Sequence, residues 1–184
     1  MNTIETQTTL EELEKTSKDF WNIARETANF LSMLIKMSNS KEVLEIGTSN
    51  GYSGIWIAKA LKETGGHLTT IEFWDNRQNM AIENFEKCGV RDIITTKLGS
   101  ALDILKNEIK NEFDFAFIDA NKGEYIKYFE LIDPILKAGG IIAADNVLSH
   151  EEKVKPFVEA IKNHPGYQVE ILNLPAGLLL AYKK

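Results

Sequence analysis

Polar residues and glycines recur directly after the short apolar segments of this chain. Carboxylates at such places can hold hydroxyl groups or a cation, glycines admit a ligand close to the backbone, and a lysine can move a proton. Short apolar segments are typical of buried β-strands, and ligands of open α/β sheets bind beyond the carboxyl ends of the strands. The residues concerned are Glu45, Gly47, Gly51, Glu72, Phe73, Gly99, Ser100, Ala101, Asp119, Lys122, Asp145 and Asn146.

The stretch 43–54, VLEIGTSNGYSG, predicts a strand, a glycine-containing turn and the start of a helix. Such a turn brings backbone N–H groups close to a ligand. Ser49 stands where the dinucleotide fingerprint needs its second glycine to admit a pyrophosphate, and the chain has no Gly-x-x-x-x-Gly-Lys-Ser/Thr motif. The pattern favours a nucleoside cofactor without a pyrophosphate. Glu72, which ends the next strand, is either the acceptor of its ribose hydroxyls or a solvated acid.

A second group of candidates follows the last strands of the alternation. Asp119, Asp145 and Asn146 offer two carboxylates and an amide, the oxygen ligands that Mg²⁺ and Ca²⁺ prefer, although an ordinary hydrogen-bonded loop cluster has the same composition. Lys122 lies three residues past Asp119. Beside a cation the pKa of a lysine falls toward the range of a general base, whereas without one Lys122 is a solvated side chain. The three histidines lack the spacing of a zinc site.

The elements that must position these residues alternate regularly. Helices are predicted over 9–38 (in one or two pieces), 52–63, 75–88, 101–110, 123–137 and 151–163, with Pro134 as a kink or early end of the fifth. Strands are predicted over 42–46, 67–72, 92–97, 113–118, 140–144, 167–173 and 178–183, with Phe113, Phe115 and Phe117 on one face. Five strand–helix repeats predict an α/β fold with a doubly wound, mostly parallel sheet. The last two strands are joined by only four residues, which allows a hairpin and hence one antiparallel strand near the edge.

Composition places the chain among ordinary globular proteins. With 184 residues, of which 43% are hydrophobic, it suits one domain over 1–184 with an N-terminal helical region over 1–40. A formal net charge of −6 argues against broad nucleic-acid binding. Cys88 is the single cysteine, so it cannot form an intramolecular disulfide, and we interpret it as a structural thiol. The absence of a long apolar run predicts a cytoplasmic protein without membrane spans, and the apolar face of helix 9–38 is compatible with a homodimer.

From about residue 30 to its end the sequence resembles the class I S-adenosylmethionine-dependent methyltransferases. Within that class it is similar to the small cation-dependent O-methyltransferases of catechol and caffeoyl-CoA type, which have a Rossmann-like fold. The segments that carry the resemblance are VLEIGTSNGYSGIWIA, TTIEFW, FDFAFIDANKGEYIKYFELIDPILKAGGIIAADNVL and LPAGLLLAYKK.

The resemblance implies roles for the candidate residues. Glu45, Gly47 and Ser53 would line the methionine end of S-adenosylmethionine, Glu72 would hold the ribose hydroxyls, and Phe73, Ser100 and Ala101 would border the adenine. Asp119, Asp145 and Asn146 match the ligands of the divalent cation, Mg²⁺ or similar, and Asp119 also approaches the amino group of the cofactor. Lys122 matches the catalytic lysine, which would take a proton from a small hydroxylated acceptor before in-line methyl transfer.

Departures from the family pattern lie where the acceptor would bind. The N-terminal region is reduced, the residues after Asn146 lack the expected glycine, the turn at Ala176 and Gly177 is short, and Asn121 stands where catechol enzymes have a tryptophan. Three alternatives therefore stay open. The first is a methyltransferase for hydroxyuridine in tRNA, the second a non-catalytic nucleoside-binding module, and the third a nicotinamide dehydrogenase. The tRNA alternative requires a basic rim of Lys110, Lys122, Lys127 and Lys153.

Overall fold

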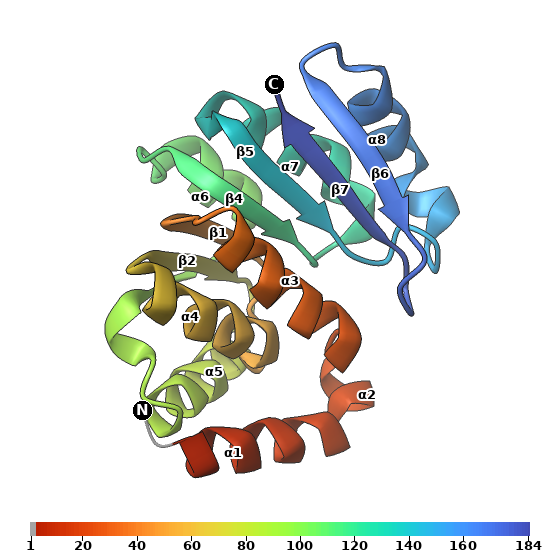
Figure 1. The fold of residues 1–184 in the computed structure, drawn as a ribbon. Helices are drawn as coiled ribbons and strands as arrows, with labels where there is room; N and C mark the ends of the chain where they lie inside the picture. The colour runs from red at the N-terminus through yellow and green to blue at the C-terminus, as the bar shows by residue number, and fades with distance from the viewer. Residues whose placement is uncertain (1–2) are drawn as a thin grey trace.

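Seven strands form a single sheet in the computed structural model, which describes residues 3–184 (Figure 1). Their order is β3-β2-β1-β4-β5-β7-β6. β7 is antiparallel to both of its neighbours, β5 and β6, and the other pairs are parallel. The predicted mostly parallel sheet with one antiparallel strand near the edge is thus confirmed. The strands are β1 (Glu42–Ile46), β2 (His67–Glu72), β3 (Ile94–Leu98), β4 (Phe113–Ile118), β5 (Leu136–Ala144), β6 (Tyr167–Leu172) and β7 (Leu178–Lys183).

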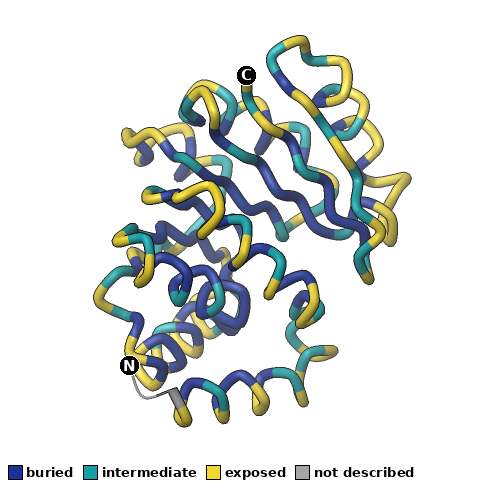
Figure 2. Tube along the Cα trace, in the orientation of Figure 1, coloured by how far each residue is buried: buried dark blue, intermediate teal, exposed yellow. Residues whose placement is uncertain are grey.

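Helices cover the sheet from two sides. One buried apolar cluster joins the sheet to α1, α3, α4 and α5, and a second joins its other face to α6, α7 and α8. Figure 2 shows the buried strands between these exposed helix surfaces. The helices are α1 (Thr3–Lys15), α2 (Ser17–Phe20), α3 (Arg25–Met37), α4 (Tyr52–Thr64), α5 (Asp75–Lys87), α6 (Ala101–Asn107), α7 (Tyr125–Ile132) and α8 (Glu151–Asn163), with short 3-10 turns η1 (Arg91–Ile93), η2 (Lys122–Glu124) and η3 (Asp133–Ile135).

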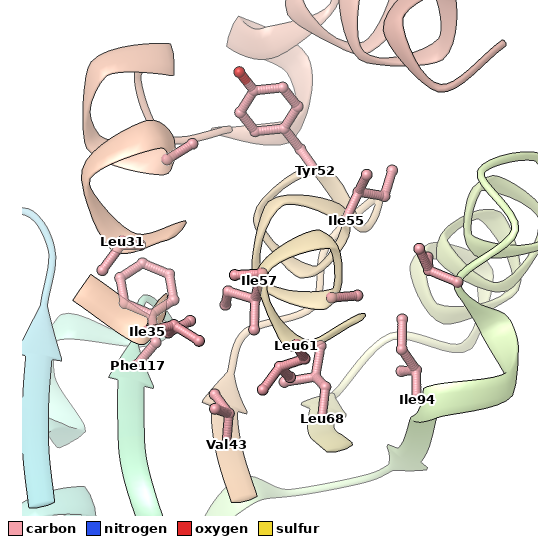
Figure 3. Packing of buried hydrophobic residues seen from close by; sticks show 14 of the residues in the cluster. Leu31, Ile35, Val43, Tyr52, Ile55, Ile57, Leu61, Leu68, Ile94 and Phe117 are labelled. Atoms are coloured by element: carbon pink, nitrogen blue, oxygen red, sulfur yellow. The ribbon is translucent and has the colours of Figure 1, made fainter. Parts of the chain in front are cut away.

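The first cluster explains why α3 and α4 lie where they do. Leu31 and Ile35 on α3, and Ile57 and Leu61 on α4, are spaced by four residues, so each pair occupies one helix face. Both pairs are fully buried, and Figure 3 shows them close to Phe117 of β4. Truncating one such leucine to alanine typically costs about 2–5 kcal/mol. This packing fixes the start of α4, and with it the turn that follows β1.

The predicted helix over 9–38 is three helices. The first, α1, includes residues before the predicted start at 9, since it spans Thr3–Lys15. Trp21 ends α2 in the left-handed conformation, with φ 56°, and turns the chain toward α3. Asn22 holds this turn, since its Nδ2 donates to the carbonyl of Leu13. The apolar periodicity could not predict this break, because the hydrogen bond from Asn22, and not a glycine or a proline, causes it.

Two further expectations around β5 need correction. The helix predicted to reach 137 ends at Ile132, and Pro134 lies in η3, which takes the chain into β5 four residues before the predicted strand. The register between β4 and β5 shifts between Phe113 and Phe115, because their partners Leu136 and Ile141 are separated by extra residues on β5. Phe113 packs in the second cluster while Phe115 belongs to the first, and the predicted single phenylalanine face is wrong.

Other boundaries differ from the predicted ones by only a few residues. Over residues 3–184, no helix is both long and apolar enough to cross a bilayer.

Candidate active site

A cleft of about 1020 Å³ opens beyond the carboxyl ends of the parallel strands. Its walls come from the turns after β1 to β5, from α2 and from the start of α8. Glu45 and Asp145 are buried and do not line the cleft. The predicted site residues that do line it are Gly47, Ser53, Glu72, Phe73, Ser100, Ala101, Asp119, Lys122 and Asn146.

The turn after β1 passes very close to the end of β4. Gly47 has φ 103°, and a Cβ atom there would collide with the carbonyl oxygen of Asp119. Only glycine therefore satisfies both the conformation and the contact. Ser49 follows with φ 49°, and its hydroxyl donates to the carbonyl of Phe20 at 2.9 Å. The residue that breaks the dinucleotide fingerprint thus joins the turn to the N-terminal region.

Glu72 is held by three backbone N–H groups. Its Oε1 accepts from Phe73 at 2.9 Å and from Trp74 at 3.0 Å, and its Oε2 accepts from Ser49 at 2.7 Å. The residue is 6% exposed and lines the cleft. Since each carboxylate oxygen has two lone pairs, Oε2 keeps one for a ligand hydroxyl. The structure therefore places Glu72 in an orientation that suits the predicted ribose contact.

Glu45 lies behind the turn and reaches the cleft only through Ser53. Its two carboxyl oxygens accept hydrogen bonds from the hydroxyls of Ser53 and Thr70, both at 2.6 Å, and Thr70 in turn contacts Thr48. Burial raises the pKa of Glu45 to about 7, opposed by the two hydrogen bonds and increased by the charge of Asp119. The predicted place of Glu45 at the methionine end stays a prediction, and the buried side chain orients Ser53, which lines the cleft.

Lys122 and Asp119 form an ion pair on the other side of the cleft. Lys122 Nζ lies 2.7 Å from Asp119 Oδ1, and both side chains are largely shielded, with exposures of 18% and 14%. Asp145 is 2% exposed, and its Oδ1 has no hydrogen-bond partner. Burial, followed by the charge of Asp119, raises the pKa of Asp145 to about 7. Two neighbouring carboxylates and only one lysine leave this corner of the site short of positive charge.

Asn146 follows Asp145 in the left-handed conformation, with φ 65°. Its Nδ2 donates to Ser149 Oγ at 3.3 Å, and the residue lines the cleft. The described part of the chain contains no group of three or more His, Cys, Asp or Glu side chains that could hold a metal ion. The candidate cation ligands therefore remain the carboxylates of Asp119 and Asp145 and the side-chain amide of Asn146.

Several lining residues were not predicted from the sequence. Phe20 and Trp21 come from the N-terminal region, and Arg77 from α5, with its guanidinium 4.6 Å from the centre of the Trp21 ring. His150 and Lys153 come from the start of α8. Phe20 and Trp21 lie far from the motifs along the chain, so no local spacing announces them, whereas His150 follows Asn146 by four residues and Lys153 was considered only for the tRNA rim. Of the basic rim that tRNA binding requires, Lys122 and Lys153 line the cleft, whereas Lys110 and Lys127 do not.

Comparison with known proteins adds three findings to this geometry. The family model described as O-methyltransferase matches residues 2–183. Tapetum-specific methyltransferase 1 of Arabidopsis thaliana is 38% identical, over 82% of this chain and 73% of that protein, and caffeoyl-CoA O-methyltransferase 2 of Petunia hybrida is 33% identical, over 89% and 77%. The crystal structure of the O-methyltransferase from Bacillus cereus in complex with SAH superposes with a TM-score of 0.87 at 29% identity, covering 96% of this chain and 91% of that one.

Proposed function

The chain belongs to the O-methyltransferase family, and on that basis we propose that it transfers the methyl group of S-adenosylmethionine to a hydroxyl of a small acceptor, assisted by a divalent cation. One observation carries the proposal. A single cleft is lined by the glycine turn at Gly47, by the oriented carboxylate of Glu72 and by the Lys122–Asp119 pair. It therefore combines groups that suit a nucleoside cofactor with groups that can activate a hydroxyl.

The cofactor half of the cleft comprises the walls around Gly47 and Glu72. S-adenosylmethionine supplies the methyl group from its sulfonium centre. Glu72 accepts the ribose hydroxyls, Gly47 and Ser53 border the methionine end, and Asp119 accepts from the amino group. The adenine lies against the remaining predicted residues, Phe73, Ser100 and Ala101. The Bacillus cereus enzyme, crystallised with SAH, supports this assignment through its similar fold.

The acceptor half of the cleft comprises Asp119, Lys122, Asn146 and the start of α8. We assign a divalent cation to Asp119, Asp145 and Asn146. The buried Asp145 Oδ1 without a partner supports this, because an orphaned carboxylate oxygen is what a hard cation satisfies. When bound, the cation supplies positive charge that lowers the pKa of an acceptor hydroxyl.

Lys122 is the residue we assign to the proton. Its Nζ now donates to Asp119 Oδ1. When Asp119 serves as a cation ligand, less of its negative charge is available to Lys122, and Nζ can turn toward the acceptor. After releasing its own proton to solvent, Nζ would take the proton of the acceptor hydroxyl, and the oxygen would attack the methyl carbon of S-adenosylmethionine as the C–S bond breaks and S-adenosylhomocysteine leaves. Asp119 thus keeps Lys122 in place between the two halves.

The acceptor is proposed to be a small molecule because two of the four lysines needed for a tRNA rim lie away from the cleft. From the sequence alone, we also propose that the protein is a cytoplasmic homodimer.

Calorimetry with purified protein and S-adenosylmethionine tests the cofactor first. We expect one molecule bound per chain, and no binding would overturn the proposal. Transfer of a labelled methyl group to a panel of catechols with Mg²⁺ tests the reaction. Cofactor binding without transfer to any catechol would favour the non-catalytic module. If the labelled methyl group were transferred to tRNA and to no catechol, the hydroxyuridine alternative would be favoured.

A further inference from the structure

Basic side chains without an ion-pair partner gather around the cleft, although the whole chain carries a net charge of −6. Among residues 3–184, Lys122 is the only basic lining residue with a salt bridge. The acids of the cleft are engaged: Glu72 accepts three backbone N–H groups, and Glu124 accepts the hydroxyl of Tyr128 at 2.7 Å. The basic lining residues without a salt bridge are Lys18, Arg77, His150 and Lys153.

These four residues divide between the two halves of the cleft. Lys18 belongs to α2 and Arg77 to α5, where Arg77 lies against the ring of Trp21 on the cofactor side. His150 and Lys153 stand at the start of α8, which packs against η2, the turn that carries Lys122. The second pair therefore faces the half of the cleft in which the acceptor is proposed to bind.

The imidazole of His150 is fixed by its own loop. Its Nδ1 lies 3.0 Å from Ser149 Oγ, and Ser149 Oγ accepts from Asn146 Nδ2 at 3.3 Å. The Ser149 hydroxyl can donate either to the carbonyl of Asn146 at 3.5 Å or, over the shorter distance, to Nδ1 of His150. When Nδ1 of the neutral ring accepts, Nε2 carries the proton and is a donor. The backbone N–H of His150 also donates to the carbonyl of Asn146 at 3.0 Å. A ring held in this way offers a hydrogen-bond donor within one turn of the proposed cation ligand Asn146.

Lys153 adds a full positive charge to the same place. His150 is the N-cap of α8 and Lys153 lies in its first turn, both side chains line the cleft, and the backbone N–H of Lys153 donates to the carbonyl of His150 at 3.0 Å. Its ammonium group offers three donors, and within the described chain it has no carboxylate partner. The pair offers donors and no bound anion, an arrangement suited to charge-assisted hydrogen bonds from a carboxylate.

We propose that His150 and Lys153 bind a carboxylate group of the acceptor, and hence that the acceptor is a compact hydroxylated acid. This inference rests on the proposed function, because it names the acceptor of the same site. A compact molecule is required because His150 lies within one turn of Asn146, so the anionic group and the reacting hydroxyl must be close together. His150 and Lys153 are specificity-determining residues in this scheme, while Lys122 remains the base.

Two acceptors that differ only in charge test the inference. We would compare 3,4-dihydroxybenzoate with 3,4-dihydroxybenzamide, because the ring and both hydroxyls are the same. With wild-type protein we expect kcat/KM to favour the benzoate by about tenfold or more, mainly through KM. H150Q and K153M should each raise the KM of the benzoate severalfold and leave that of the benzamide unchanged. K155M is the matched control, since Lys155 lies on the same helix outside the cleft.

Binding measurements separate this inference from the proposed function. Calorimetry with protein loaded with S-adenosylhomocysteine and Mg²⁺ gives the affinity for both acceptors even without turnover. Equal affinities in the wild type, or an unchanged preference in H150Q/K153M, would overturn the carboxylate site while methyl transfer stood. Caffeoyl-CoA serves as a third test acceptor. If the wild type bound caffeoyl-CoA more tightly than both small acceptors and K153M lost this preference, the inference would also be overturned, because Lys153 would then recognise a remote phosphate. Failure to bind S-adenosylmethionine at all would instead count against the proposed function.

Discussion

The two halves of the cleft differ in how far their polar groups are satisfied by the protein itself. In the cofactor half, the Glu72 carboxylate accepts three backbone hydrogen bonds and the buried Glu45 accepts two from side chains. In the acceptor half, Asp145 Oδ1 has no partner, and within residues 3–184 His150 and Lys153 have no ion pair. The acids of one half are thus satisfied before a ligand arrives, whereas Asp145 in the other half is not, although the buried Asn50 Nδ2 of the glycine turn also has no partner.

This difference indicates how binding energy is divided between the two ligands. A preorganised pocket loses little conformational freedom on binding, so the cofactor half can bind its ligand before any acceptor is present. In the acceptor half, the buried Asp145 lacks a compensating cation, and the exposed His150 and Lys153 lack an anion. Variants in one half should therefore leave the other largely unchanged, and the predictions below test that independence.

Replacing Lys122 should have the largest effect. Lys122→Met removes the proposed base, so we expect kcat to fall by about 10²–10⁴-fold while the affinity for S-adenosylmethionine stays within about threefold of the wild type. Single-turnover kinetics and calorimetry measure the two quantities. Lys127→Met is the matched control, because Lys127 is exposed on α7 and does not line the cleft. Unchanged turnover in Lys122→Met would remove Lys122 as the base, and an equal loss of cofactor affinity would break the division into halves.

Removing the cation should come next. We expect Asp145→Asn to lower kcat by about 100-fold and to abolish the increase in melting temperature that Mg²⁺ gives the wild type. Treating the wild type with a chelator should produce the same loss of turnover. Asp103→Asn, which changes an exposed acid on α6 outside the cleft, is the control. Full activity in chelator would contradict the assigned cation, even if the cofactor half behaved as expected.

The close contact between the turn and β4 can be tested by adding one methyl group. Gly47→Ala forces both an unfavourable φ and a collision with the Asp119 carbonyl, so we expect a loss of stability of about 3 kcal/mol and a weaker cofactor complex. Gly65→Ala shares the positive φ, but its Cβ would meet only the Lys41 side chain at 4.0 Å, so the expected cost is about 1 kcal/mol. Urea denaturation of both variants compares them. Equal losses would show that the collision is relieved by movement of β4.

Much of the cofactor half was predictable from the sequence because local patterns determine it. The strand and turn over 43–54 place Gly47, and the next strand places Glu72, within one continuous strand–helix–strand unit. Glu45 was also named from the sequence as lining the methionine end, and that role stays a prediction. What the sequence did not reveal is that β1 is buried on both faces, so that the hydroxyl of Ser53 stands between Glu45 and the cleft.

The acceptor half was less predictable because it is assembled from segments that are distant in sequence. Asp119 and Lys122 were both named from the sequence as candidates, but the ion pair between them became visible only in the structure. The same holds on the cofactor side for Trp21, which reaches the cleft because Asn22 and Ser49 bend the N-terminal region over the turn, and such tertiary hydrogen bonds leave no periodic signal. His150 was recognised only as part of a departure from the family pattern, and its contribution to the cleft became visible through the fold.

The smallest predicted effect concerns the pH dependence of stability and distinguishes the halves by their buried acids. The pKa of Glu45 is about 7 in the folded protein and 4.5 ordinarily, so between these values the folded state retains a proton that the unfolded state has lost. The free energy of unfolding therefore falls as the pH rises through this interval, and Glu45→Gln should remove about 2 kcal/mol of that fall. Denaturation at pH 5 and pH 8 measures the change. The pKa of Asp145 is also about 7, so Asp145 contributes to the same decrease in the free energy of unfolding, and this contribution should remain in Glu45→Gln. It should disappear when Mg²⁺ binds in place of the proton. If Mg²⁺ instead abolished the share due to Glu45, the two halves would be one electrostatic unit, and the independence inferred from their hydrogen bonds would be wrong.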